Sequence, residues 1–172
     1  WGGVVGEDGI GGIQLGGDYP GNAYADFQKC LRTLASRGIA LAIASKNDED
    51  LALQVISQHP EMVLSPDDIV AHRINWLPKW QNVVEMVEEL NLSLRNVMFI
   101  DDSPAEREHM RRQLPMVRVL ELPDDPALFT SVFLGDPYIE TLGITEEDSK
   151  RVKNYQARKQ AEKERTRFER VE

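Results

Sequence analysis

Short apolar segments alternate with amphipathic helical segments along most of the chain, and this alternation constrains the fold more than any other feature. The pattern predicts strands over 39–45, 61–65, 96–102 and 116–123, and helices over 22–38, 47–59, 77–93 and 103–115. Such alternation is typical of an α/β unit with a parallel sheet. In sheets of this kind, sites form beyond the carboxyl ends of the strands. Polar residues at those ends are therefore the first candidates for function.

Both ends of the chain depart from this alternation. Residues 2–17 are glycine-rich, and apolar residues flank a Glu-Asp-Gly turn, so we expect a small β-hairpin flap. Near the other end, Thr145 and Asp148 form a capping box before a long polar helix whose last residues should fray. Residues 145–172 carry nine Lys/Arg and seven Asp/Glu, whereas the whole chain has a net charge of −9. We therefore predict a core over 1–135 and an extension with a polar helix over 136–172.

Composition excludes several classes of protein. The acidic net charge argues against a general nucleic-acid binder. Cys30 is the single cysteine, so there is no internal disulfide, and its helical face with Phe27 and Leu34 predicts a structural thiol. No apolar run approaches the ~20 residues that span a bilayer, and no signal-peptide pattern is present. We expect a cytoplasmic protein that binds neither nucleic acid nor membrane.

Two polar clusters follow predicted strands. Asp101 and Asp102 end the strand over 96–102, where adjacent carboxylates repel each other unless something offsets their charge. A divalent cation held by oxygen ligands is one explanation, and a pair of ordinary turn residues is the other. Ser45 ends the strand over 39–45, just before a helix for which Asn47 is a plausible cap. Its hydroxyl could bind a phosphate oxygen, or it could be a simple loop serine.

Lys79 lies in the first turn of a predicted helix, at the positive end of the helix dipole. A bound anion would explain a lysine there, because helix starts bind phosphate well; an exposed side chain is the alternative. Glu106 is best explained as part of a capping box with Ser103, with Pro104 at the first helical position. Hydroxyl, lysine and paired aspartates together predict a phosphate site with a magnesium corner.

The order Ser45, Lys79, Asp101-Asp102 resembles the second, third and fourth motifs of the haloacid-dehalogenase (HAD) superfamily. The segments "WGGVVGEDG", "RGIALAIASKNDED", "INWLPKWQNV", "FIDDSPAERE" and "LPDDPALF" closely resemble its FkbH-like branch, subclass IIIC. This resemblance covers residues 1–135 almost continuously. "GITEEDSKRVKNYQ" is similar to the C-terminal extension of that branch.

The resemblance implies a Rossmann-like core without a large cap, Mg²⁺ as cofactor and an aspartate nucleophile. FkbH-like proteins of polyketide biosynthesis dephosphorylate the glyceryl unit of 1,3-bisphosphoglycerate and load it as a thioester on an acyl carrier protein. By position, Ser45 would hold a phosphoryl oxygen, Lys79 would stabilise the transition state, and Asp102 would ligate Mg²⁺ while Asp101 orients a bound water and completes the metal corner. The expected substrate-binding set is Ser45, Lys46, Asn47, Lys79, Asn75 and Trp76.

Two departures from the family qualify this reading. The nucleophile motif, Asp-x-Asp-x-Thr, and the first core strand would precede Trp1, so we expect natural sequence upstream of it. Many relatives carry Cys directly before the motif-two serine, where this chain has Ala44. Unless Ala44 is an engineered change, this argues against an enzyme-bound thioester, and direct transfer to the carrier's own thiol is the route that stays open. A HAD phosphatase for a small phosphate ester and a non-catalytic carrier-docking module remain the alternatives.

Overall fold

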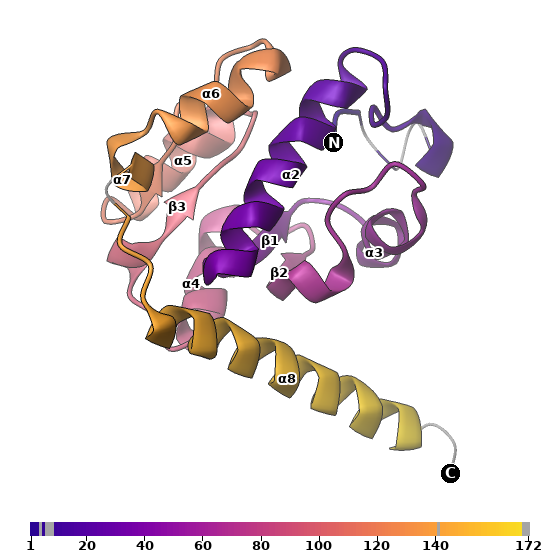
Figure 1. The fold of residues 1–172 in the computed structure, drawn as a ribbon, viewed down its shortest axis with the longest axis vertical. Coiled ribbons are helices and arrows are strands. Elements are labelled where there is room, and N and C mark those ends of the chain that lie inside the picture. The colour runs from indigo at the N-terminus through magenta and orange to yellow at the C-terminus, as the bar shows by residue number, and fades with distance from the viewer. Residues whose placement is uncertain (4, 6–8, 141, 170–172) are drawn as a thin grey trace.

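The computed structural model describes residues 1–3, 5, 9–140 and 142–169 (Figure 1). Its α-helices are α2 (Gly21–Arg37), α3 (Glu49–Gln58), α4 (Lys79–Glu89), α5 (Pro104–Gln113), α6 (Phe129–Leu134), α7 (Pro137–Glu140) and α8 (Glu146–Glu169). Its strands are β1 (Leu41–Ser45), β2 (Ile69–Ile74), β3 (Met98–Phe99) and β4 (Arg118–Val119). Short 3-10 helices are η1 (Ile10–Gly12), η2 (Pro66–Asp68), η3 (Leu94–Asn96) and η4 (Pro126–Leu128).

The strands form two parallel pairs. β1 runs parallel to β2 from Leu41 opposite Ile69 to Ser45 opposite Ile74, with a register irregularity after Leu41. β3 runs parallel to β4 over two residue pairs. In Figure 1, α2 crosses in front of the strands and α4 lies behind them. This arrangement confirms the predicted α/β class with parallel strands and helices on both faces, a Rossmann-like architecture.

The helices α2 and α4 join the two strand pairs through apolar clusters. Behind the strands, Met86 of α4 belongs to a buried cluster that contains Val70 of β2 and Phe99 of β3. In front, Leu34 of α2 packs with Phe129 of α6 and with Leu120, which follows β4. Burial of this apolar surface is the main stabilising contribution to the fold. It also fixes the distance between the two strand pairs.

The predicted strand over 61–65 is wrong, because that segment is an irregular loop. The backbone of this loop pairs with a side chain and not with a neighbouring strand. The buried Gln28 accepts hydrogen bonds from the N–H groups of Val63 and Leu64, each at 3.0 Å. The neighbouring strand is β2, which sequence analysis did not predict. Its polar pair, His72 and Arg73, obscured the apolar pattern.

Two predicted helix starts are refined. The N-cap of α3 is Asp48, which accepts a hydrogen bond from the N–H of Leu51, so the cap assigned to Asn47 is wrong by one residue. At α5, Ser103 is the N-cap as predicted, and its Oγ accepts from the N–H of Glu106 at 3.4 Å. The Glu106 carboxylate does not close the predicted box; it binds Lys46 instead.

The predicted hairpin flap is present at its base. Gly2 and Gln14 form an antiparallel bridge, and the residues after the turn begin with η1 rather than with a strand. Val5 and Ile13 are buried together with Val55 of α3. Val4 and the Glu-Asp pair of the predicted turn lie outside the described residues. Apolar packing against α3 therefore holds the base of the flap in place.

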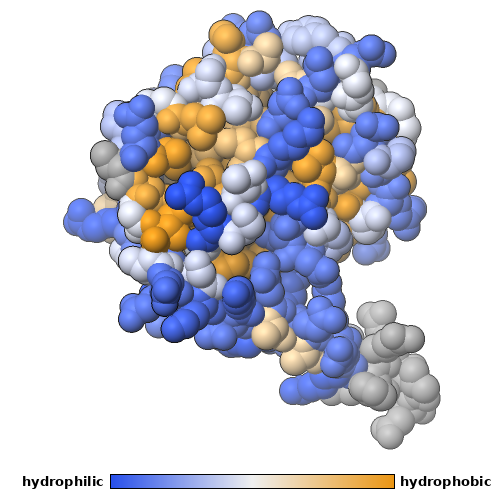
Figure 2. Space-filling model, in the orientation of Figure 1, coloured by the Kyte–Doolittle hydropathy of each residue, from blue (hydrophilic) through white to orange (hydrophobic). Residues whose placement is uncertain are grey.

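The C-terminal helix α8 starts with the predicted capping box, in which the Thr145 N–H and hydroxyl donate to the Asp148 carboxylate. Its first half packs on the body through Val152 and through Tyr155, which donates to the carbonyl of Leu90. Further along the helix, Lys159 donates to the carbonyls of Pro66 and Ile69, and the part of α8 beyond it extends away from the body with a polar surface (Figure 2). Residues 170–172, where fraying was expected, lie outside the described residues. Among the described helices, none combines the length and apolarity that a membrane crossing requires.

Candidate active site

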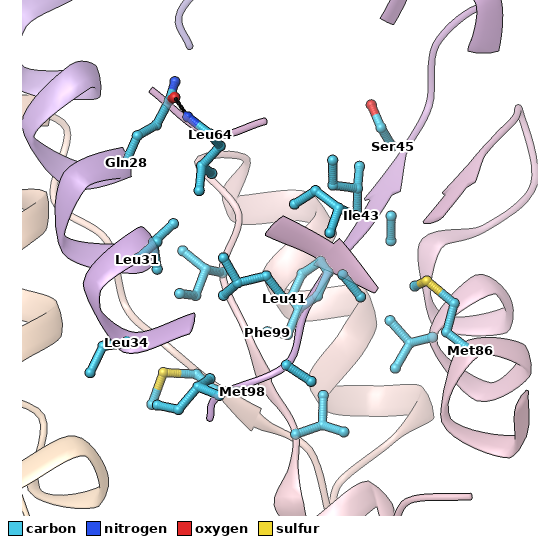
Figure 3. A pocket seen from close by; sticks show the side chains of 18 of the residues that line it. Gln28, Leu31, Leu34, Leu41, Ile43, Ser45, Leu64, Met86, Met98 and Phe99 are labelled. Atoms are coloured by element: carbon cyan, nitrogen blue, oxygen red, sulfur yellow. Dashed lines mark hydrogen bonds between the residues drawn. The ribbon is translucent and has the colours of Figure 1, made fainter. Parts of the chain in front are cut away.

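A cavity of about 1000 Å³ separates the two strand pairs. Leu41 and Ile43 of β1 line one side of it, and Met98 and Phe99 of β3 line the other (Figure 3). Side chains from α2 and α4, including Leu34, close its faces. Within the described part of the chain, β1 pairs only with β2, and β3 only with β4. The facing edges of β1 and β3 are thus separated by an apolar slot.

The polar end of this slot collects most of the predicted site residues. Ser45, Lys46 and Asn47 line it from the end of β1, and Lys79 lines it from the first residue of α4. Asp102 lines it from the loop after β3. The fold therefore brings together residues that are far apart in sequence, as parallel strands do at their carboxyl ends.

Lys79 and Asp101 form an ion pair in this region. The distance from Lys79 Nζ to Asp101 Oδ2 is 2.6 Å, and the two side chains are 15% and 6% exposed. Such burial costs hydration of both charges, which close pairing offsets only in part. The other carboxylate oxygen of Asp101 accepts the N–H of Ser103 at 3.0 Å. Both oxygens of Asp101 are therefore engaged within the protein.

Asp102 is in the opposite situation. Its side chain is exposed at the cavity, and none of the described residues donates a hydrogen bond to its carboxylate. A free carboxylate beside a second one suits Mg²⁺, which binds through one or two carboxylates and keeps several waters. The described residues hold no cluster of three or more acidic, histidine or cysteine side chains. The donor set present fits a magnesium ion that relies on water and further ligands.

Two features at the polar end of the slot were not predicted, an ion pair and a tyrosine. Lys46 Nζ lies 2.7 Å from Glu106 Oε1, so an ion pair links the loop after β1 to the start of α5. Tyr24 of α2 lines the cavity, and burial together with the charge of Asp102 raises the pKa of its phenol. Its hydroxyl therefore stays protonated beside Asp102 at neutral pH. Its place on a helix is the one feature of Tyr24 that could be predicted from the sequence.

Of the predicted substrate-binding residues, Asn75 and Trp76 do not line the cavity, and neither does Asp101, which reaches it only through its ion pair with Lys79. Asn75 and the fully buried Asn82 exchange hydrogen bonds through their amides, at 2.9 and 3.2 Å. The N–H of Asn75 also donates to the carbonyl of Ser45 at 3.0 Å. Asn75 thus ties the end of β1 to the turn that leads into Lys79. Trp76 is 76% exposed beside this turn.

The first described residues lie at the same cavity. Trp1 and Gly3 line it together with Asp102.

These features define a Rossmann-like domain in which a hydroxyl, a lysine and two aspartates gather at the carboxyl ends of the strands. Among solved structures, the chain is similar to the N-terminal part of the protein BF1531 from Bacteroides fragilis, which contains a phosphatase domain and was crystallised in complex with Mg. The two are 39% identical with a TM-score of 0.76. The match covers 85% of this chain but only 38% of that one. No protein-family model matches the sequence, and the comparison with curated proteins gives no match.

Proposed function

We propose that this chain is part of a Mg²⁺-dependent phosphatase of the HAD type. The observation that carries the proposal is the convergence of Ser45, Lys79 and the Asp101-Asp102 pair at one end of the slot. The likeness to BF1531, whose phosphatase domain was crystallised with Mg, supports both the activity and the cofactor. Lys79 and the aspartates also supply the charges that phosphoryl transfer requires.

In this proposal each residue has a distinct role. The Ser45 hydroxyl donates to a phosphoryl oxygen, and the Lys79 ammonium neutralises charge that develops on the transferring group. Asp102 binds Mg²⁺, and Asp101, held by Lys79 and by the N–H of Ser103, orients a water beside it. A bound Mg²⁺ would act as a Lewis acid toward the phosphoryl oxygens.

The nucleophile would come from a segment before Trp1. We propose that this segment adds a parallel strand between β1 and β3 and carries the Asp-x-Asp-x-Thr motif. The apolar walls of the slot and the unpaired edges of both strands support this arrangement. A strand there would satisfy the backbone groups on both edges. Because Trp1 and Asp102 line the same cavity, such a strand would end beside the aspartates.

The finer proposal is glyceryl transfer. The resemblance to FkbH-like proteins implies that the substrate is 1,3-bisphosphoglycerate and that an acyl carrier protein receives the glyceryl unit in a polyketide pathway. Two exposed apolar side chains near Lys79, Trp76 and Leu77, favour a macromolecular partner over a small ester alone. With Ala44 before Ser45, the carrier thiol would attack the acyl carbon directly, so that inorganic phosphate leaves C1, the thiol loses its proton and the thioester forms. Hydrolysis of the remaining C3 phosphate ester at the phosphatase site, which consumes one water and releases a second phosphate, would leave the glyceryl thioester. A cytoplasmic location belongs to the same proposal.

The test uses the full-length protein with 1,3-bisphosphoglycerate, with Mg²⁺ or EDTA, and with or without phosphopantetheinylated carrier protein. Phosphate release and the intact mass of the carrier are measured together. Mg²⁺-dependent release with a carrier heavier by one glyceryl group supports the whole proposal. Release that ignores the carrier supports a phosphatase for a small ester. Carrier binding without release at any Mg²⁺ concentration contradicts the enzyme and favours a docking module.

A further inference from the structure

Arg107 is a charged residue that the fold buries beneath the aspartate pair. It lies in α5, and only 4% of its surface is exposed. One of its terminal nitrogens, Nη1, donates to the carbonyl oxygens of Asp101 and Asp102, at 2.8 and 2.9 Å. A single guanidinium nitrogen thus holds two successive peptide groups of the candidate metal corner.

The guanidinium is itself held in place from outside. Its Nη2 donates to Glu121 Oε1 at 2.8 Å, and Arg111 donates to the other oxygen of the same carboxylate. These two arginines hold the pKa of Glu121 below its usual value. The Arg107 Nε is buried and has no hydrogen-bond partner among the described residues. Burying a charged group with an unsatisfied donor is destabilising, so fold stability alone explains Arg107 poorly.

The backbone at this position has little other support. β3 ends at Phe99, and its ladder with β4 covers two residue pairs. Residues 100–103 have no regular secondary structure. The directions of the Asp101 and Asp102 side chains depend on the orientation of these peptide groups. Hydrogen bonds to their carbonyls therefore set where the two carboxylates point.

We infer that Arg107 is a positioning residue that fixes the aspartate pair for metal binding, with Glu121 holding the guanidinium. The inference rests on the proposed function, because it assigns a purpose to the geometry of that same site. Lys79 and the N–H of Ser103 hold the Asp101 side chain, whereas Arg107 holds the main chain. The two sets of contacts act on different atoms of one loop.

The experiment compares Arg107→Met and Arg107→Lys with Arg112→Met in the full-length protein. Arg112 is a matched control on the same helix, because its side chain is 73% exposed and pairs with Glu108. Two quantities are measured: the Mg²⁺ concentration at half-maximal phosphate release, and hydrogen exchange of the Asp102 and Ser103 amides. We expect Arg107→Met to raise both the half-saturating Mg²⁺ concentration and the exchange rate at least tenfold. Arg107→Lys should give intermediate values, and Arg112→Met should stay within twofold of the wild type.

If Arg107→Met does not fold, Glu121→Gln replaces it, since this change frees the guanidinium without leaving a cavity. It should raise both quantities about threefold. Mg²⁺ dependence and amide exchange that match those of Arg112→Met in the folded variants would overturn the inference. A wild type that releases no phosphate would contradict the proposed function, and amide exchange would still decide the role of Arg107 in holding the loop. Unchanged exchange in that case overturns the positioning role as well.

Discussion

The β1–β2 pair and the β3–β4 pair hold the two sides of the candidate site in different ways. The β1–β2 ladder has five residue pairs, and Ser45 is itself part of it, opposite Ile74. The β3–β4 ladder has two residue pairs, and it ends two residues before Asp101. The backbone of Ser45 is thus fixed by strand pairing, whereas the aspartates on the other side lie beyond the end of their ladder.

Side chains compensate for the shorter ladder. Lys79 reaches the carboxylate of Asp101 from α4, and Arg107 reaches its carbonyl from α5. A loop that carries charged groups can therefore be fixed by buried cations where strand pairing ends early. Substitutions on the β3 side should therefore alter site geometry, and substitutions at the end of β1 should remove single contacts.

The largest effect is expected from the free carboxylate. In the full-length protein, Asp102→Asn should reduce Mg²⁺-dependent phosphate release by about 10³-fold or more, because the metal loses its charged ligand. Phosphate release at saturating substrate, over a range of Mg²⁺ concentrations, measures this loss. Asp124→Asn is the control, since Asp124 is also an exposed aspartate after a strand. Retained turnover at ordinary Mg²⁺ concentrations would contradict the role given to Asp102.

The ion pair that crosses between the two sides should give the next largest effect. Lys79→Met should lower the rate of phosphate release by about 10²- to 10³-fold, as loss of a group that stabilises transition-state charge does. The free energy of unfolding should fall by no more than about 3 kcal/mol, because Asp101 keeps the N–H of Ser103. Single-turnover kinetics and urea unfolding are the two measurements. A fall in rate that is fully accounted for by a smaller fraction of folded protein would mean that Lys79 is mainly structural.

The packing of α5 can be tested without touching the site. Met110 is 1% exposed on this helix, so Met110→Ala should lower the free energy of unfolding by about 2–5 kcal/mol through loss of buried contacts and a new cavity. Urea denaturation gives the value. Met116 is 49% exposed, and Met116→Ala should change stability by less than about 0.5 kcal/mol. A small loss for Met110→Ala would show that the β3 side does not depend on α5 for its stability.

The smallest effect concerns pH. Since Arg107 and Arg111 lower the pKa of Glu121 from its ordinary value of 4.5, the ionised carboxylate stabilises the folded state above that value. This contribution disappears as the pH falls through the lowered pKa in the folded protein. Glu121→Gln should therefore be less stable than the wild type at pH 6.5, by less than about 1 kcal/mol because the side chain is 66% exposed. The urea midpoints of the two proteins should differ at pH 6.5 and converge only when the pH lies below the lowered pKa of Glu121.

Much of this arrangement could be predicted from the sequence. Two apolar runs predicted β1 and β3, and the helix predicted over 77–93 placed Lys79 at a helix start, as the structure does. These signals are local, because periodicity and capping act over a few residues. β2 escaped prediction because His72 and Arg73 interrupt its apolar pattern. The segment 61–65 was wrongly predicted as a strand, because its apolar residues belong to a loop whose backbone N–H groups donate to Gln28.

The contacts within the site could not be predicted, because each joins residues distant in sequence. In "AEREHMRRQ", Arg107 reads as one of several charged residues on a surface helix. A weak signal was available: Arg107, Met110 and Leu114 are spaced three and four residues apart, as on one helical face. Both Met110 and Leu114 are buried. An arginine on the apolar face of a short helix therefore indicates a buried partner, here the carbonyls after β3.

The most direct test of the account is a crystal structure of the full-length protein grown with Mn²⁺ in place of Mg²⁺ and with beryllium fluoride as a phosphoryl analogue. Anomalous scattering would locate the metal independently of the protein atoms. We expect a metal ion bound to Asp102, the fluoride contacting Ser45 and Lys79, and a parallel strand between β1 and β3. A metal or analogue bound away from these residues, or β1 and β3 left unpaired along the slot, would contradict it.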